Sequence, residues 1–270
     1  MEKKLETKLH KLETLIASYK SALVAFSGGV DSSLLAYVCK KTLGKDVLLV
    51  TAISSTYPKN ELEDARSFAA LIELPLLEIM SEELGIPEFS SNPHNRCYHC
   101  KRELFGKLKT IASEKSISVI FDGNNASDAD DFRPGRTAAR ESGIVSPLSE
   151  TGLTKEDIRI LSREFGLPTA EKPAMACLAS RFPYGELITS EKLLRVRTAE
   201  QEIRELGFTQ FRVRSHGDLA RIEIIENEMD RAFSMRLKIT DLLKRAGFVY
   251  QSIDLQGYRT GAMNEGLIKK

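Results

Sequence analysis

The alternation of short apolar runs with amphipathic segments is the strongest pattern in the first two thirds of the chain. Each apolar run has the length of a buried strand, and the segments between the runs carry apolar residues at helical spacing. The predicted strands are 22–26, 47–53, 75–80 and 118–122, and the predicted helices are 1–20, the segment from the first strand through Lys41, 58–71, 102–115 and 154–165. Strands that alternate with helices predict an α/β fold, a doubly wound parallel sheet with ligands beyond the carboxyl ends of its strands.

After about residue 185 the pattern changes to an α+β module. Its predicted helices and alternating strands are 190–206, 208–215, 219–225, 227–245 and 248–255. We place the boundary near Tyr184 and Gly185. Residues 1–184 then form one α/β domain, and residues 185–270 form a smaller module for substrate binding or oligomerisation.

A glycine-containing turn follows the first strand and opens the next helix. Two glycines let the backbone turn tightly and direct N–H groups inward, so that the turn and the helix N-terminus can cradle an anion. Three serines add hydroxyl donors, and Asp31 suits a Mg²⁺ ion that neutralises phosphate charge. The expected ATP-binding residues are Ser27, Gly28, Gly29, Asp31, Ser32 and Ser33. The alternative is a glycine-rich turn with helix-capping serines.

Composition favours a small-molecule substrate. The formal net charge is +1 and 29% of the residues are charged, so nucleic acid is not the expected partner. No apolar stretch reaches the roughly 20 residues that cross a bilayer, and the first 20 residues lack the pattern of a secretory signal. We therefore expect a cytoplasmic protein without membrane contacts, in which thiols stay reduced.

Three of the four cysteines form a candidate metal site. Cys97 and Cys100 make a C-x₂-C motif, and Cys177 stands in a later loop. Three thiolates can hold a [4Fe–4S] cluster with one open iron, or a zinc ion together with His94 or His99. A third interpretation is a redox pair beside a lone nucleophile, Cys177. Cys39 lies among apolar residues of a helix and is interpreted as a buried apolar side chain.

Several motifs in this order resemble known enzymes. SGGVDSS after a strand resembles the PP-loop of ATP pyrophosphatases, which cleave ATP between the α and β phosphates. The set SGGVDSS, RCYHCK, SDADDFRPG, KPAMACLASRFPYG and FRVRSHGDLARIE covers most of the chain and resembles the LarE family of ATP-dependent sulfur transferases. That family makes part of the nickel-pincer nucleotide cofactor of lactate racemase.

The resemblance implies an activity. ATP and Mg²⁺ adenylylate a carboxylate of pyridinium-3,5-biscarboxylic acid mononucleotide, and sulfur replaces AMP to give a thiocarboxylate. One branch of the family surrenders the sulfur of the cysteine that matches Cys177, whereas the other delivers sulfide from a cluster on three cysteines. With Cys97, Cys100 and Cys177 all present, the chain resembles the cluster branch. The resemblance also implies a homo-oligomer, a hexamer, and leaves the sulfide donor open.

The resemblance assigns further residues as well. Arg212 and Arg214 alternate along a strand and share one face, which suits the substrate phosphate. Candidates for contact with substrate or metal are Ser180, Arg181, Glu200, Glu223 and Asp230. Lys155 or Arg159 is expected to reach the ATP phosphates, unless their helix face is merely solvated. The roles of Asp128, Asp131 and Arg133 stay open.

Other functions fit part of this pattern. A tRNA-thiolating PP-loop enzyme would need a basic surface. A PP-loop amidotransferase or synthetase would use ammonia and would not need the three cysteines. A zinc-stabilised nucleotide-binding protein without catalysis would release no pyrophosphate.

Overall fold

The computed structural model describes residues 3–54, 56, 59–130, 134–173, 176–259 and 261–264. The chain forms two compact units: unit 1 is Met1–Phe89 with Asn95–Met175, and unit 2 is Ser90–His94 with Ala176–Lys270. In the described parts, no helix combines the length and the apolar character that a membrane crossing requires. The two units are described one at a time.

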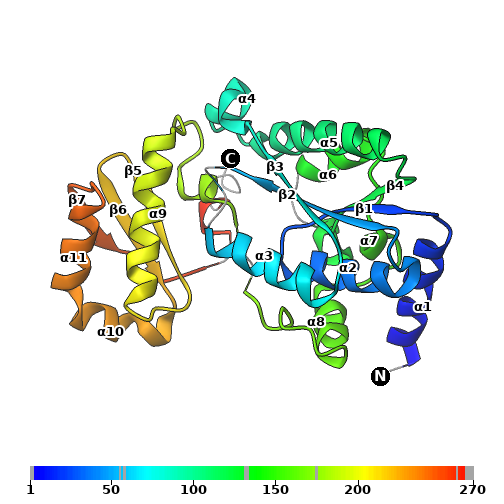
Figure 1. Ribbon diagram of the computed structural model, residues 1–270. Helices are drawn as coiled ribbons and strands as arrows, with labels where there is room; N and C mark the ends of the chain where they lie inside the picture. Colours follow the sequence, from blue (N-terminus) through cyan, green and yellow to red (C-terminus); the bar gives the residue numbers. More distant parts are fainter. Residues whose placement is uncertain are drawn as a thin grey trace. The chain divides into compact units, whose positions relative to one another are not determined.

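Unit 1 is built on a parallel sheet with the strand order β3-β2-β1-β4 (Figure 1). The strands are β1 (Ala22–Ala25), β2 (Val47–Ile53), β3 (Leu76–Met80) and β4 (Val119–Phe121). Ala22 of the central strand β1 lies opposite Val47 on one side and Val119 on the other. All carboxyl ends therefore meet at one edge, as the doubly wound prediction requires.

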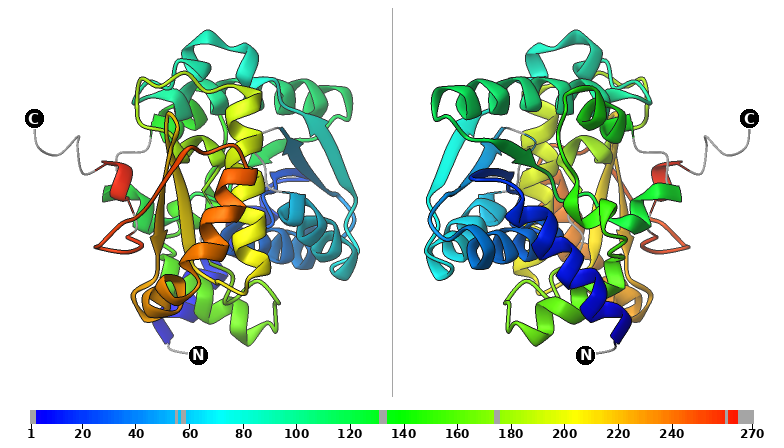
Figure 2. Two further views of the ribbon diagram at one scale, coloured as in Figure 1. Left: turned by 90° about the vertical axis from the view of Figure 1, so that its left-hand side faces the viewer. Right: turned by 90° about the vertical axis from the view of Figure 1, so that its right-hand side faces the viewer.

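Helices cover both faces of this sheet. The helices in this part of the chain are α1 (Lys3–Ala17), α2 (Val30–Leu43), α3 (Lys59–Leu71), α4 (Pro87–Ser90), α5 (Arg96–Glu114), α6 (Pro134–Glu141), α7 (Pro147–Glu150) and α8 (Lys155–Glu164). Ala22 and Val24 pack with α1, α2 and α8 on one face, whereas Leu23 packs with α5 and α6 on the other. Figure 2 shows α1 along this unit, beside α2 and α7. Burial on both faces explains why the strands have no polar alternation.

Unit 2 contains a three-stranded sheet with the order β5-β6-β7. Its elements are α9 (Ser190–Glu205), β5 (Phe211–His216), β6 (Leu219–Ile224), α10 (Met229–Ser234), α11 (Arg236–Arg245) and β7 (Tyr250–Ile253). β5 pairs antiparallel with β6, and β7 pairs parallel with β6. The helix predicted over 227–245 is interrupted at Met235, where the Ser234 hydroxyl donates to the Arg231 carbonyl at 2.7 Å.

The division between the units differs from the predicted boundary at 184/185. Segment 90–94 belongs to unit 2, because the buried Asn92 amide donates to the carbonyls of Phe182 and Pro183 at 3.3 and 2.6 Å. Backbone bonds from Gly185 and Ile188 complete the pairing with this segment. Cys177 therefore lies in unit 2, a placement that depends on pairing between segments about 90 residues apart in the chain.

Candidate active site

The glycine turn lies at the carboxyl end of β1, as predicted. Gly28 has a φ of +70°, a backbone conformation that residues with a side chain rarely adopt. A Cβ at this position would also lie only 3.2 Å from the Cβ of Ala65 on α3. Gly29 is the N-cap of α2 without a side-chain cap. The first N–H groups of α2 are therefore open to an anion.

Hydrogen bonds of serine hydroxyls stabilise this turn. The Ser27 and Ser32 hydroxyls lie 3.1 Å apart, and the Ser32 hydroxyl donates to the Gly29 carbonyl at 3.1 Å. Ser33 Oγ is buried without a hydrogen-bond partner among the described residues. A buried hydroxyl without a partner is costly, so Ser33 is suited to meet an incoming phosphate oxygen.

Asp31 connects the turn to α8. Its Oδ2 lies 2.6 Å from the Nζ of Lys155, whereas its Oδ1 is buried without a hydrogen-bond partner in the described structure. A carboxylate oxygen with unused acceptor capacity beside a phosphate cradle fits a Mg²⁺ ligand, since Mg²⁺ prefers carboxylate, water and phosphate oxygens. The residues present therefore fit the expected ion.

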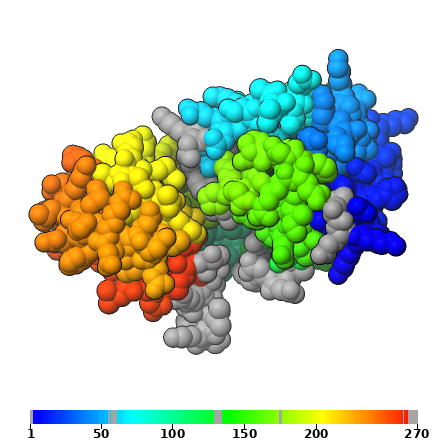
Figure 3. All heavy atoms as spheres, turned by 90° about the horizontal axis from the view of Figure 1, so that it is seen from below, coloured from blue at the N-terminus to red at the C-terminus, as the bar shows by residue number. Residues whose placement is uncertain are grey.

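Of the two basic residues predicted to reach phosphate, α8 brings only Lys155 to the turn. The buried side of α8 packs on α2, and its outer face lies on the surface seen in Figure 3. Arg159 instead donates to the carbonyls of Ala170 and Lys172, the latter at 3.0 Å. That side chain holds the loop after α8.

The loop after β4 supplies residues that sequence reasoning did not select. A Cβ on Gly123 would lie 3.2 Å from the backbone N of Ser32, so β4 ends against the start of α2. The buried Asp122 carboxylate accepts from the Ser146 hydroxyl at 2.6 Å and from the Asn124 backbone N–H at 3.2 Å. The only signal in the sequence was their place just after a predicted strand.

The sequence left the roles of Asp128, Asp131 and Arg133 undecided, and the structure describes only the first of them. Asp128 is buried and accepts from the Asn125 N–H at 3.0 Å, so it stabilises its own loop. Asp131 and Arg133 lie outside the described residues. An open groove of about 460 Å³ lies next to this loop and is lined by Asn124, Arg136, Thr137, Ala139, Arg140, Ile144, Ser146, Ser149 and Glu150.

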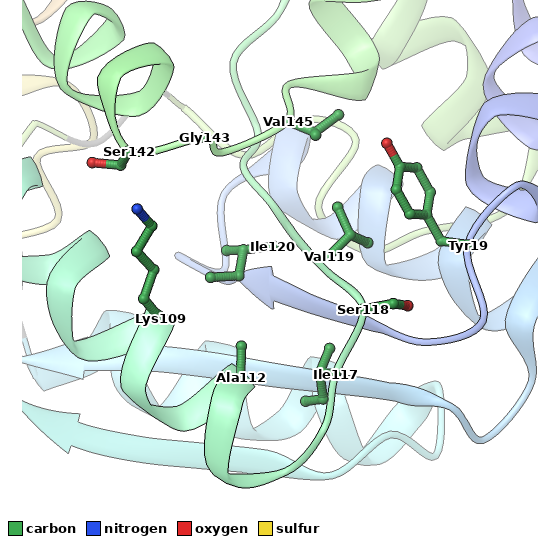
Figure 4. Close-up of a pocket in the computed structure, with 10 residues that line it drawn as sticks. All are labelled: Tyr19, Lys109, Ala112, Ile117, Ser118, Val119, Ile120, Ser142, Gly143 and Val145. Carbon is green, nitrogen blue, oxygen red and sulfur yellow. The ribbon is translucent and has the colours of Figure 1, made fainter.

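A second pocket of unit 1 lies at the opposite edge of the sheet. It has a volume of about 340 Å³, and Figure 4 shows Tyr19, Lys109 and Ser142 around it. Tyr19 precedes β1, and Val119 begins β4, so the pocket opens at the amino ends of the strands. It is not part of the nucleotide site, which α/β sheets place at the carboxyl ends.

Cys97 and Cys100 lie at the start of α5. This helix begins at Arg96, six residues before the predicted start, so the two cysteines are three residues apart on one helix face. Cys97 is exposed and Cys100 is half-buried. Two accessible thiols at this spacing can each supply one metal ligand.

The described residues do not complete a metal site. Within them, no three or more His, Cys, Asp and Glu side chains gather in an arrangement that could hold a metal ion. Cys97 and Cys100 belong to unit 1, and Cys177 belongs to unit 2. The three-thiolate cluster stays a prediction. Cys39 is completely buried and burial raises the pKa of its thiol, which confirms its interpretation as an apolar core residue.

Cys177 is exposed at the start of η3 (Leu178–Arg181) in unit 2. The Arg181 guanidinium, buried beneath this turn, makes a bidentate ion pair with Glu200, with N–O distances of 2.8 and 3.0 Å. Burial alone disfavours the charged carboxylate, but the ion pair with Arg181 outweighs it and lowers the pKa of Glu200.

The predicted pair Arg212 and Arg214 lies on β5, with both side chains mostly buried. Arg214 pairs with Glu223 at 2.7 Å and donates to the Ser180 carbonyl at 3.0 Å. Arg212 donates to the Phe211 carbonyl at 2.7 Å, and burial together with the nearby Arg181 lowers its pKa. A cation held among other guanidiniums favours a nearby anion.

The three acidic candidates of unit 2 have different surroundings. Glu200 and Glu223 are buried and each pairs with an arginine, whereas Asp230 is exposed on α10. Glu223 also accepts from Arg221 at 3.0 Å. Glu200 and Glu223 therefore balance the charge of buried guanidiniums. Their places on a helix and a strand did not reveal these partners.

The sheet, the glycine turn and the Asp31–Lys155 pair define unit 1 as an ATP-pyrophosphatase-type α/β unit. A family model for NAD synthase matches residues 2–93. An uncharacterized protein of Synechocystis sp. is 42% identical over 268 residues, which cover 98% of this chain and 100% of that protein. Pyridinium-3,5-bisthiocarboxylic acid mononucleotide synthase of Lactiplantibacillus plantarum is 35% identical over 263 residues, 96% of this chain and 95% of that enzyme.

A tRNA-specific 2-thiouridylase of Pelobacter propionicus is 31% identical over 182 residues, but these cover only 55% of this chain and 51% of that enzyme. A match of this extent leaves nearly half of each chain uncovered. The match to the mononucleotide synthase covers 96% of this chain at 35% identity and decides the family. The chain belongs to the LarE family of PP-loop enzymes.

Proposed function

We propose that the chain catalyses ATP-dependent sulfur insertion into pyridinium-3,5-biscarboxylic acid mononucleotide. A carboxylate oxygen of the substrate attacks the α-phosphorus of ATP, pyrophosphate leaves, and an acyl adenylate forms. A sulfur nucleophile then adds to the acyl carbon, and AMP leaves with the former carboxylate oxygen. The product is a thiocarboxylate. The observation that carries the proposal is an exposed thiol, Cys177, in a chain that also has an ATP-type phosphate cradle.

The residues of unit 1 support the first step. The N–H groups at the start of α2 and the hydroxyl of Ser33 would receive phosphate oxygens. Asp31 Oδ1 would hold Mg²⁺, which offsets phosphate charge when bound. The ammonium group of Lys155 lies beside Asp31 and would move to a phosphate once the ion occupies the carboxylate.

The residues of unit 2 support binding and sulfur delivery. Arg212 would face the substrate phosphate, with Arg214 beside it on the same strand face. Cys97, Cys100 and Cys177 would hold a [4Fe–4S] cluster through their thiolates. The cluster, when bound, would supply sulfide at its open iron. If Cys177 gave its own sulfur instead, dehydroalanine would remain at that position.

One experiment tests this assignment. Protein purified without oxygen is incubated with ATP, Mg²⁺, sulfide and the mononucleotide, and AMP and thiocarboxylate are measured. We expect both products in equal amounts and about four irons per chain. Cys97→Ala, Cys100→Ala and Cys177→Ala should each lose the iron, whereas Cys39→Ala should keep it. Two single variants that retain iron would show that the ligand assignment is wrong, and AMP without thiocarboxylate would exclude sulfur transfer.

We further propose that the protein works as a homo-oligomer, a hexamer by resemblance to its family. Large apolar side chains on the surface of unit 2 support self-association. These exposed residues are Leu187, Leu194, Phe233, Leu237, Val249, Tyr250 and Leu255.

A further inference from the structure

Arg181 is the largest side chain that is completely buried, with 0% of it exposed. One edge of its guanidinium faces Glu200, where Nε and Nη2 donate to the two carboxylate oxygens at 2.8 and 3.0 Å. This is the bidentate geometry that fixes the plane of a guanidinium as well as its position. Glu200 therefore determines the orientation of Arg181.

The remaining edge of the guanidinium holds the turn that carries Cys177. Nη1 donates to the carbonyls of Ala176 and Cys177 at 2.8 and 3.2 Å and to the Ser180 hydroxyl at 3.0 Å. The Cys177 carbonyl also accepts from the Ser180 N–H at 3.0 Å. The backbone on either side of Cys177 is thus held by a buried side chain, while Cys177 itself is exposed.

The same network reaches the strand predicted to bind phosphate. Glu200 Oε1 also accepts from the Val213 N–H at 3.0 Å, between Arg212 and Arg214. Arg214 donates to the Ser180 carbonyl at 3.0 Å, so β5 is joined to the Cys177 turn directly by this bond and indirectly through Glu200 and Arg181. The position of the thiol is consequently tied to the position of the arginine pair.

Neither substrate contact nor plain stabilisation accounts for this arrangement. All three nitrogens of Arg181 already donate hydrogen bonds within unit 2, and no part of the side chain is exposed to a ligand. A buried ion pair also contributes little net stability, because desolvation offsets the attraction between the charges. What it supplies is a fixed geometry.

We propose that Arg181, oriented by Glu200, is a positioning residue that holds the Cys177 turn in place for sulfur transfer. The proposal rests on the proposed function, because it assigns Cys177 a role in delivering sulfur. Arg181 and Glu200, which were predicted to contact substrate or metal, would instead act through Cys177. A displacement of about 1 Å at a reacting group can reduce a rate by as much as about 100-fold.

The test uses Arg181→Lys, Glu200→Gln and, as matched control, Glu202→Gln. Lysine retains the charge but cannot make the bidentate contacts. Glutamine at 200 keeps an acceptor for the Val213 N–H but loses the charge. Glu202 lies on the same helix and pairs only loosely with Arg245, at 3.5 Å, so its replacement should change neither readout. Arg181→Lys risks misfolding, and Glu200→Gln is the milder change.

Two measurements are made on each variant. Hydrogen exchange of the full-length protein without substrate should become about 10-fold faster at the amides of Ser180 and its neighbours in 176–182, with α9 and β5 still protected. In turnover, kcat for the thiocarboxylate should fall about 10- to 100-fold, while KM for the mononucleotide stays within about twofold.

Unchanged exchange in 176–182 would overturn the positioning role, whatever the activity. Loss of protection throughout α9 and β5, or a rise in KM that matches the fall in kcat, would show a merely structural role and also overturn it. If wild-type protein made no thiocarboxylate but the exchange result held, the proposed function would fail while the control of the turn by Arg181 stood.

Discussion

The two oxygens of Asp31 have different surroundings, and this difference makes the residue testable. One oxygen is paired with Lys155, and the other is buried without a hydrogen-bond partner in the described structure. Asp31→Asn keeps the size of the side chain but removes the charge that would hold Mg²⁺. We expect AMP release to fall about 100-fold or more, since a bound metal ion supplies several kcal/mol to a phosphoryl transition state.

The measurement is AMP release with iron content determined on the same sample. Asp46→Asn is the matched control in unit 1, because Asp46 is exposed just before β2. The control should retain full activity, and Asp31→Asn should retain its iron. Loss of iron from Asp31→Asn would mean that the nucleotide and cysteine sites cannot be separated in the way we propose.

Residues within the glycine turn were predictable because their chemistry is local. Gly28 and Asp31 lie in one short segment between a strand and a helix, so type and spacing sufficed. The partners of Arg181 and Arg214 were not predictable in this way. Their carboxylates lie 19 and 9 residues further along the chain, and nothing in the spacing of the charges distinguishes a buried pair from a solvated one.

The start of α8 carries Lys155 to the phosphate turn and is itself a titratable element. Thr154 and Asp157 form a capping box, with bonds of 3.2 and 2.9 Å, and Asp157 also pairs with Lys8 of α1 at 2.5 Å. Burial raises the pKa of Asp157, but the bonds from Lys8 and Thr154 outweigh it, so the net pKa is lowered. Its contribution to stability must therefore depend on pH.

A lowered pKa in the folded state means that this stabilisation is complete above the unfolded pKa, about 3.9, and is lost as pH falls through the folded value. Asp157→Asn should lower the free energy of unfolding by about 1 kcal/mol at pH 7, as for other caps. Urea unfolding should show this difference shrink towards zero as pH falls below the unfolded pKa and through the lower folded value. Glu156→Gln removes a carboxylate from the same turn but not from the box, and a pH dependence equal to that of Asp157→Asn would contradict the assignment.

Element by element, periodicity predicted most of unit 1, and β2 has the predicted bounds. It worked because parallel strands are uniformly apolar and helices follow a different period. The predicted helix began too late at α5, since RCYHCK has no apolar stripe, and the break at Met235 lies beside the hydrogen bond from the Ser234 hydroxyl to the Arg231 carbonyl. Both depend on single hydrogen bonds or tertiary packing rather than on period.

At the scale of the whole molecule, unit 2 carries most of the large exposed apolar side chains among the described residues. Phe233 on α10 and Leu237 on α11 are 64% and 72% exposed, and Tyr250 on the edge strand β7 is 66% exposed. Exposed apolar side chains of this size suit a contact with another protein, and an edge strand adds unpaired backbone groups. In the homo-oligomer that we propose, a second copy of the chain would cover these side chains.

Leu237→Lys tests this association directly. An ammonium group cannot be buried in an apolar contact without a cost of several kcal/mol, so the variant should dissociate. Light scattering coupled to gel filtration should give a multiple of 30.1 kDa for wild type and 30.1 kDa for the variant. Leu71→Lys, at a 61% exposed position in unit 1, should leave the oligomer intact. A wild-type mass of 30.1 kDa at micromolar concentration would exclude self-association, and dissociation by Leu71→Lys instead would place the contact on unit 1.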